Sequence, residues 1–344
     1  MSGTRTGTAS GKVILLGEHA VVYGVPALAV GIDRGARATA TTVAAGPSRL
    51  RVRGWEVDVT EDDATNDLGR AFGALVRAVR AEASGPAHVH VVAETDLPPG
   101  GGLGCSAAIG VAVARAITDS SDVSAARLSS FVNAWEQVFH GNPSGVDAAV
   151  CARGGCVVFQ KQDEQAHLEP VAVKGGLTLC IGNSGIASST KSMVESVARL
   201  AERRPTVVQK AWDGIAALVR NARLAIEAGD RFALGRLMDL NQMLLSGLFL
   251  STPEIETMCE AARGASALGA KLTGAGGGGS VVALVNGMAG AERVLAAWRK
   301  EGFTGFAARV APAEEAEHPR AHAHAHAHAH EQAAHAQAIG GGPS

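Results

Sequence analysis

Hydrophobic and polar positions in the first part of the chain follow the patterns of β-strands. Aliphatic runs occupy residues 12–16 and 27–32. Residues 37–43 and 50–53 are rich in Thr and Val or alternate apolar with polar side chains, which is typical of strands. The chain is therefore predicted to open as a β-sheet.

A helix and a strand are predicted next. Asn66 and Asp67 can cap a helix whose apolar residues recur at helical spacing. These apolar residues are Leu68, Phe72, Leu75, Val76 and Val79. Residues 88–92 alternate like a strand, and residues 107–117 are almost wholly apolar. An all-apolar helix must be buried on every side, so the last segment is predicted to be a helix between the sheet and neighbouring elements.

The second half of the chain alternates between further strands and helices. The polar stretch 161–167 is predicted as a hairpin or linker. Strands are predicted at 156–160, 177–181, 271–273, 280–285 and 305–310, and helices at 194–200, 207–227, 232–245 and 294–300. This order predicts an α+β fold without solenoid repeats.

The length of 344 residues exceeds what a single hydrophobic core usually serves. We expect two domains, over residues 1–168 and 169–312. Residues 313–344 lose apolar periodicity and contain an Ala-His alternation over 321–330, so a disordered His/Ala-rich tail is predicted there. Its imidazoles can chelate nickel, zinc or copper, but a repeat without a catalytic role is the favoured interpretation.

Charge and cysteine content narrow the class of protein. The formal net charge of -2 comes from mixed acidic and basic residues, which excludes the usual signatures of nucleic-acid and membrane-surface binding. The five cysteines are scattered, mostly in apolar runs, as expected for buried thiols in a reducing compartment. No apolar signal core or membrane-spanning run is recognised, so a cytoplasmic location is predicted. The oligomeric state stays open, with a homodimer among the alternatives.

A glycine-rich loop over residues 96–104 precedes the all-apolar segment. Glycines let backbone N–H groups converge on one point, and the start of a buried helix adds a positive dipole, so the loop is suited to phosphate oxygens. The alternative is a glycine turn with Ser106 as an ordinary helix cap. The Lys-Ser/Thr ending of a Walker A loop is missing, and the loop is not a Rossmann fingerprint.

Three motifs in order resemble the GHMP kinase family. The pattern Pro-x-x-x-Gly-Leu-Gly-x-Ser-Ala-Ala in residues 98–108 resembles its ATP-phosphate motif, and residues 11–24 and 271–280 resemble its first and third motifs. The resemblance implies two lobes, a ribosomal protein S5 domain 2-like N-terminal domain and a ferredoxin-like C-terminal domain, with ATP and substrate between them. The implied ATP-binding residues are Pro98, Gly100, Gly101, Gly102, Leu103, Gly104, Cys105, Ser106 and Ala107.

One segment points to a subfamily. Residues 140–147 read His-Gly-Asn-Pro-Ser-Gly-Val-Asp and follow Glu136, which resembles mevalonate kinases; Asn241-Gln242 also lies in a helix similar to theirs. The resemblance implies phosphoryl transfer from ATP, with Mg²⁺, to mevalonate. The alternatives are phosphomevalonate, another small hydroxy acid or a sugar as the acceptor, or a non-catalytic nucleotide or metabolite sensor.

The resemblance assigns roles that fit the chemistry of phosphoryl transfer. Ser106 and Glu136 are oxygen donors suited to Mg²⁺. Asp147 would accept or orient the proton of the attacking hydroxyl, and Lys12 would stabilise the developing alkoxide. The ordinary alternatives are an exposed lysine at a strand start and an aspartate that caps a helix.

Other candidates carry weaker signals. Glu18 and His19 are candidate substrate contacts, although a single histidine beside an apolar strand is as often a core residue. Thr190 resembles a substrate-side threonine, but Ser/Thr clusters before helices usually cap them. Gly276 and Gly277 either approach the substrate and phosphates or form a tight hairpin. Cys105 stands where the family usually has serine, and an inert thiol is the favoured interpretation.

Overall fold

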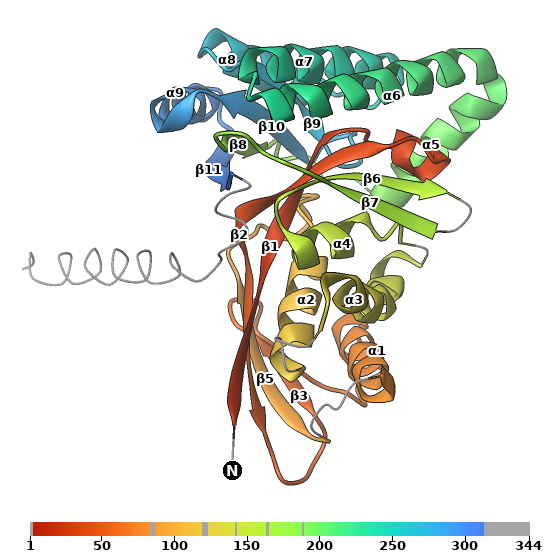
Figure 1. Cartoon of the computed structure of the whole chain (residues 1–344), viewed down its shortest axis with the longest axis vertical. Coiled ribbons are helices and arrows are strands. Elements are labelled where there is room, and N and C mark those ends of the chain that lie inside the picture. The colour runs from red at the N-terminus through yellow and green to blue at the C-terminus, as the bar shows by residue number, and fades with distance from the viewer. Residues whose placement is uncertain are drawn as a thin grey trace, which may run out of the picture.

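The computed structural model describes residues 3–82, 87–118, 123–141, 143–162, 165–187 and 189–312. Two β-sheets, each covered by helices, form two lobes, and this confirms the predicted two-lobed α+β fold (Figure 1). The predicted tail, residues 313–344, lies outside the described residues. Within the described ranges, no helix is both long and apolar enough to cross a lipid bilayer.

The first sheet branches around one long strand. It consists of β1 (Thr4–Leu16), β2 (Ala27–Thr42), β3 (Arg49–Val52), β4 (Val57–Thr60), β5 (Val89–Thr95), β6 (Cys156–Gln162) and β7 (Gln165–Val171). The order is β4-β3-β5-β2-β6-β7, and β1 pairs with β2. Residues 27–30 of β2 pair with β6 and residues 36–42 pair with β5, so β2 is the strand at which the sheet divides.

The structure refines two predictions made from the sequence. The runs at 27–32 and 37–43 form one strand, because the polar residues between them are accommodated by a register shift against β1 between Ser10 and Gly11. Within the stretch 161–167, residues 161–162 end β6 and residues 165–167 begin β7, so the alternative of a hairpin is confirmed, and β7 continues to Val171. The predicted domain boundary after residue 168 therefore falls inside a strand, and the division into 1–168 and 169–312 stays a prediction.

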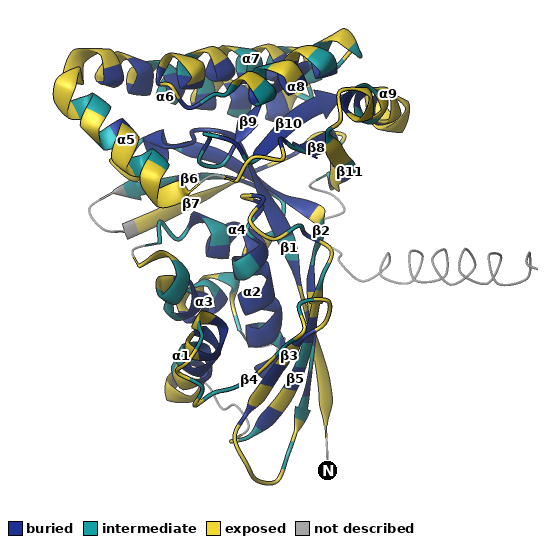
Figure 2. Ribbon diagram, turned by 180° about the vertical axis from the view of Figure 1, so that it is seen from behind, coloured by how far each residue is buried: buried dark blue, intermediate teal, exposed yellow. Residues whose placement is uncertain are grey.

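Four helices and a short 3-10 turn belong to the first lobe. They are α1 (Asp67–Glu82), α2 (Cys105–Ile117), α3 (Ala125–His140), α4 (Val146–Arg153) and the turn η1 (Ala20–Tyr23). Nearly every residue of α2 is buried, as Figure 2 shows, because α2 lies between the sheet and its neighbouring helices. A Cβ atom on Gly7 of β1 would lie 2.2 Å from the carbonyl oxygen of Ala112, so the absence of a side chain lets strand and helix approach.

The second lobe has the strand order of a split βαβ arrangement. Its sheet is β11-β8-β10-β9, formed by β8 (Leu177–Asn183), β9 (Gly269–Thr273), β10 (Ser280–Val285) and β11 (Thr304–Val310), and every pair is antiparallel. This order matches the predicted ferredoxin-like topology. The helices are α5 (Thr190–Arg203), α6 (Pro205–Ala228), α7 (Arg231–Gly247), α8 (Pro253–Gly264) and α9 (Gly287–Lys300).

Candidate active site

Glycine-rich loops from the two lobes meet beside the start of α2. The first loop, residues 98–104, connects β5 to α2, and the second, residues 274–279, connects β9 to β10. The hydroxyl of Ser280 donates a hydrogen bond to the carbonyl oxygen of Gly101 at 2.7 Å. In the first motif, the backbone N–H of Lys12 donates to the carbonyl oxygen of Leu103 at 2.8 Å, so the first and third motifs both contact the middle one.

Gly104 caps the N-terminus of α2 through its backbone. Its φ of 69° lies in the left-handed region, and a Cβ atom there would be 3.4 Å from Cβ of Lys12 and 3.3 Å from Sγ of Cys151. The N–H groups in the first turn of such a helix have no partner within it. The geometry therefore combines free amide donors, a helix dipole and a close lysine at one place, which suits a phosphate group.

Cys105 turns away from this loop. Its side chain is buried, and its sulfur lies 3.8 Å from the carbonyl oxygen of Leu97 and 3.9 Å from Oγ1 of Thr95. Burial raises the pKa of the Cys105 thiol. The favoured interpretation of an inert thiol agrees with this arrangement, and any contact of Cys105 with nucleotide would come from its backbone.

Lys12 and Asp147 form an ion pair beside the first loop. Nζ of Lys12 lies 2.8 Å from Oδ1 of Asp147 and donates to the carbonyl oxygen of Gly102 at 3.2 Å. Lys12 is 3% exposed, so it is not a solvent-facing lysine at a strand start. Asp147 lies in the first turn of α4, whose N-cap is Gly145, so Asp147 is not the capping residue. Its side chain remains 33% exposed and can be reached by a substrate.

Ser106 and Glu136 also meet, from α2 and α3. The Ser106 hydroxyl donates to Oε1 of Glu136 at 2.7 Å and accepts from the indole N–H of Trp135 at 2.9 Å. Ser106 is thus not the helix cap, which is Gly104. Burial raises the pKa of Glu136 to about 7; the charge of Asp147 adds to this rise, whereas the Ser106 hydrogen bond and Lys12 oppose it.

Glu18 and His19 connect the two lobes. The Glu18 carboxylate forms a fully buried ion pair with Lys271 of β9 and accepts from the amide of Asn241 in α7 at 3.2 Å. Nε2 of His19 lies 2.6 Å from the carbonyl oxygen of Ala275, so a neutral ring with the proton on Nε2 donates there. Burial raises the pKa of Glu18 and lowers that of His19.

These contacts do not support the predicted role of Glu18 in binding substrate, because both of its carboxylate oxygens are engaged inside the protein. The alternative considered for His19, a satisfied core histidine, agrees with its burial. Direct contact of His19 with substrate stays a prediction. Lys271 and Ser280 lie in the third motif, but neither was singled out by sequence reasoning, because nothing local shows which partner each one meets.

Thr190 and the second glycine loop lie on neighbouring segments. Thr190 is exposed at the start of α5, and the cap is Ser189, whose hydroxyl accepts from the N–H of Ser192. A Cβ atom on Gly277 would lie 2.5 Å from the sulfur of Met193, so the loop packs directly on the first turn of α5. Gly276 and Gly277 therefore serve close packing, and their contact with substrate or phosphates stays a prediction.

A pocket of about 480 Å³ adjoins the first glycine loop between the lobes. Pro98 and Pro99 form one side of it, together with Trp55 from the turn after β3. Asn183 of β8 and Phe306 of β11 contribute from the second lobe. An apolar and aromatic recess that leads to a phosphate-binding loop is suited to the base of a nucleotide.

Comparisons with known proteins agree with this geometry. The family model for the GHMP kinases N terminal domain matches residues 70–155, and the model for the GHMP kinases C terminal domain matches residues 222–304. A mevalonate kinase of Aeropyrum pernix is 34% identical over 293 residues, which cover 80% of this chain and 87% of that protein. A mevalonate kinase of Pyrococcus abyssi is 34% identical over 300 residues, which cover 81% of this chain and 88% of that protein.

Solved structures show the same relationship. The crystal structure of L. major mevalonate kinase in complex with R-mevalonate matches with a TM-score of 0.78 and 27% identity, and covers 91% of this chain and 97% of that one. The Methanococcus jannaschii mevalonate kinase matches with a TM-score of 0.76 at 22% identity, which indicates a shared fold. With both lobes matched and relatives aligned over most of their length, the chain belongs to the GHMP kinase family, among the mevalonate kinases.

Proposed function

We propose that the protein transfers the γ-phosphoryl group of ATP to the 5-hydroxyl group of mevalonate, giving 5-phosphomevalonate and ADP. The observation that carries this proposal is the position of Lys12, whose Nζ contacts both Asp147 and the carbonyl oxygen of Gly102 in the phosphate loop. A general-base candidate is thereby held beside the place where a phosphoryl group would lie. The mevalonate kinase relatives support mevalonate as the acceptor.

ATP would bind with its phosphates against the N–H groups of residues 100–106 and its base in the pocket beside Pro98. The glycine loop and the start of α2 supply donors that need no rearrangement. Binding in this orientation directs the γ-phosphate toward Lys12 and Asp147. These residues then act on the acceptor hydroxyl.

Mg²⁺ fits the donors that Ser106 and Glu136 present. Their side-chain oxygens lie 2.7 Å apart, both on the first lobe, and oxygen is the ligand that this cation prefers. Among the residues that the structure describes, no group of three or more His, Cys, Asp or Glu side chains is arranged to hold a metal. A magnesium ion shared with nucleotide phosphates is usually held by only one or two protein ligands, and water completes its coordination. When bound, the ion neutralises charge on the phosphate oxygens.

Asp147 and Lys12 act on the acceptor hydroxyl. The exposed part of the Asp147 carboxylate can accept a hydrogen bond from the hydroxyl and orient its oxygen toward phosphorus, or remove its proton during transfer. The ammonium group of Lys12 stabilises negative charge that develops on the same oxygen. Because Lys12 is buried and bonded to Gly102, its position requires little reorganisation during the reaction.

The closest alternative retains the chemistry and changes the acceptor. A Lactococcus lactis galactokinase and a Streptococcus pneumoniae phosphomevalonate kinase share the fold, with TM-scores of 0.71 and 0.70 at 17% and 19% identity. Release of ADP should therefore be measured with mevalonate, phosphomevalonate, galactose and homoserine under matched conditions. We expect kcat/KM for mevalonate to exceed the others by about 100-fold or more. Good activity on another acceptor beside none on mevalonate would refute this choice of substrate.

The setting of the enzyme is also inferred. All five cysteines are free and buried, which fits a reducing compartment, so we infer a cytoplasmic location. Its partners would be ATP and mevalonate, with neither nucleic acid nor membrane involved. A homodimer remains one alternative for its assembly.

A further inference from the structure

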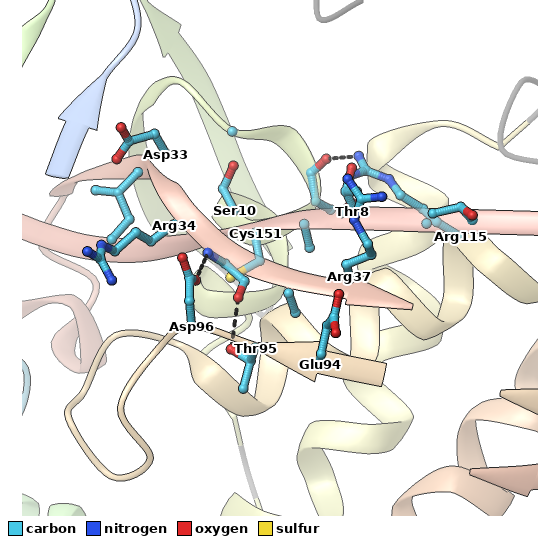
Figure 3. Close-up of a pocket in the computed structure, with 18 of the residues that line it drawn as sticks. Thr8, Ser10, Asp33, Arg34, Arg37, Glu94, Thr95, Asp96, Arg115 and Cys151 are labelled. Carbon is cyan, nitrogen blue, oxygen red and sulfur yellow. Dashed lines mark hydrogen bonds between the residues drawn. The ribbon is translucent and has the colours of Figure 1, made fainter. Parts of the chain in front are cut away.

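A second, larger groove lies on the first lobe, apart from the candidate active site. Its volume is about 900 Å³. It is lined by residues 6–10 of β1, 32–37 of β2, 94–96 at the end of β5, Arg115 of α2 and residues 151–154 at the end of α4 (Figure 3). Lys12, Ser106, Glu136 and Asp147 are not among these residues. The proposed reaction therefore leaves this groove without a role.

Arginines dominate the charge of the groove. Arg34, Arg37, Arg115 and Arg153 line it, and Arg34 lies over the ring of Phe306 at 4.4 Å. Within the described part of the chain, no ion pair within 4 Å includes any of the other three. Three guanidinium groups that face one groove and are not held in such an ion pair favour an anionic ligand.

Arg115 is the most constrained of the three. Its two terminal nitrogens donate to the carbonyl oxygens of Thr8 and Ala152, which hold the guanidinium at the edge of β1. Burial lowers the pKa of Arg115, because no carboxylate compensates the loss of water around its charge. A bound anion would supply that compensation.

Each of the three acidic residues of the groove has a partner within the protein. Oδ1 of Asp96 accepts from the N–H of Gly35 at 2.7 Å, and Oδ1 of Asp33 accepts from the N–H of Arg309 at 2.8 Å. Glu94 pairs directly with Arg37 across β5 and β2, and its Oε2 lies 3.6 Å from Nη1 of Arg53, an arginine that does not line the groove. Because four arginines line the groove with these three carboxylates, the lining keeps a net positive charge.

Hydroxyl groups lie next to the arginines. Thr8 pairs directly with Arg37 across β1 and β2, so the two side chains share one face of the sheet. Figure 3 shows Arg37 and Arg115 reaching the same part of the groove, with Thr8 beside them and Ser10 farther along the strand. Guanidinium and hydroxyl donors in this combination match a phosphate group, which offers several acceptor oxygens.

We propose that this groove is a second ligand site, which binds a phosphate-bearing small molecule through Arg37, Arg115 and Arg153, with Thr8 and Ser10 as hydroxyl donors. The site is separate from the nucleotide loop, and its occupant would be either free phosphate or a phosphate ester.

The test uses the full chain with the nucleotide site filled by saturating magnesium and AMPPNP. Binding of inorganic phosphate, and separately of glycerol 3-phosphate, is measured by calorimetry. We expect saturable binding of one anion per chain, weakened about tenfold in Arg37→Gln, because one charge-assisted contact is lost. Arg51→Gln is the matched control, since Arg51 is an exposed arginine of the same lobe that does not line the groove.

The outcomes separate clearly. Tighter binding of the ester identifies an organic phosphate as the ligand class, and equal affinity identifies the free anion; either supports the site. Absence of saturable binding to the wild type overturns it. So does wild-type affinity in Arg37→Gln, or an equal loss in Arg51→Gln. Unchanged turnover of mevalonate in Arg37→Gln confirms that this variant is folded.

Discussion

Nζ of Lys12, on β1, lies 2.8 Å from Oδ1 of Asp147, on α4. The lysine is buried and the aspartate is partly open, so one member of the pair is fixed and the other can meet a substrate. A carboxylate with a specific charge partner in an accessible site is a candidate functional group. The first predictions follow from this pair and from its neighbour Glu136.

Asp147→Asn should lower kcat about 100-fold to 10,000-fold, because the amide retains the shape of the side chain but cannot accept a proton. KM for ATP should change little, since Asp147 is not part of the phosphate loop. Steady-state kinetics with mevalonate measure both quantities. Asp62→Asn, at an exposed position away from the site, is the control. Wild-type turnover in Asp147→Asn would remove Asp147 from the mechanism.

Glu136→Gln should change activity and stability in opposite directions. Loss of a carboxylate ligand should raise the magnesium concentration for half-maximal activity about 10-fold to 100-fold. The pKa of Glu136 is raised from 4.5 to about 7 in the folded protein. The Glu136 carboxyl therefore contributes to the free energy of unfolding at low pH, and this contribution is lost as pH rises through 7. Without metal, at about pH 8, the glutamine variant should be more stable by at most about 3 kcal/mol.

Urea unfolding without metal, at about pH 8 and at about pH 4, tests the second part. The gain in stability should largely disappear at the lower pH, where the carboxyl is mostly protonated in both states. A variant that is equally destabilised at both values would show that Glu136 contributes through packing alone.

The Glu18–Lys271 pair should act as one unit that holds the lobes together. Lys271→Met leaves a buried carboxylate without its partner and should lower the free energy of unfolding by about 3 kcal/mol. The double variant Glu18→Gln/Lys271→Met removes both charges and should recover most of that loss. Denaturant unfolding of the wild type, both single variants and the double variant gives the coupling energy. Additive losses would contradict a direct interaction.

His19 should make stability depend on pH. Its pKa in the folded protein lies below the ordinary value of 6.5, so the unfolded chain takes up a proton more readily. The free energy of unfolding is therefore retained above pH 6.5 and falls as pH drops through the lower pKa of His19 in the folded protein. His19→Gln keeps a donor for the Ala275 carbonyl and should reduce this dependence.

The check is the difference between the urea midpoints of wild type and His19→Gln at about pH 7.5 and about pH 5.5. We expect the wild type to lose more stability than the variant on acidification. The comparison cancels contributions from other groups, including Glu136, whose raised pKa acts in the opposite direction. Parallel losses in the two proteins would exclude His19 as the source.

Much of the fold was predictable because its pattern is local. The apolar run of α2 follows from burial of all its faces. The alternation of apolar and polar residues in β5 follows from burial of one face of the strand. Helix α3 was not predicted, although Leu128, Phe131, Val132 and Trp135 recur at helical spacing. Helices α4 and α8 were also missed; for α8 the signal was Thr252 as N-cap followed by Pro253.

The candidate active site was predictable from the family resemblance and not from local sequence patterns. The proximity of Lys12 to Asp147 and of Ser106 to Glu136 came from the resemblance, because these residues lie on separate elements and no local pattern relates them. The Glu18–Lys271 pair and the arginine groove depend on how β1, α2, α4 and the second sheet pack together. Such contacts follow from tertiary packing, which single-sequence patterns do not encode.

The most direct test of the proposed reaction is identification of its product. Purified protein, Mg-ATP and R-mevalonate should be followed by ³¹P NMR, with Asp147→Asn in parallel. We predict that the wild type converts ATP to ADP with stoichiometric formation of a phosphate monoester coupled to the protons on C5 of mevalonate, and that Asp147→Asn forms it far more slowly. ADP formation without that ester, or the same ester formed equally fast by the variant, would contradict the account.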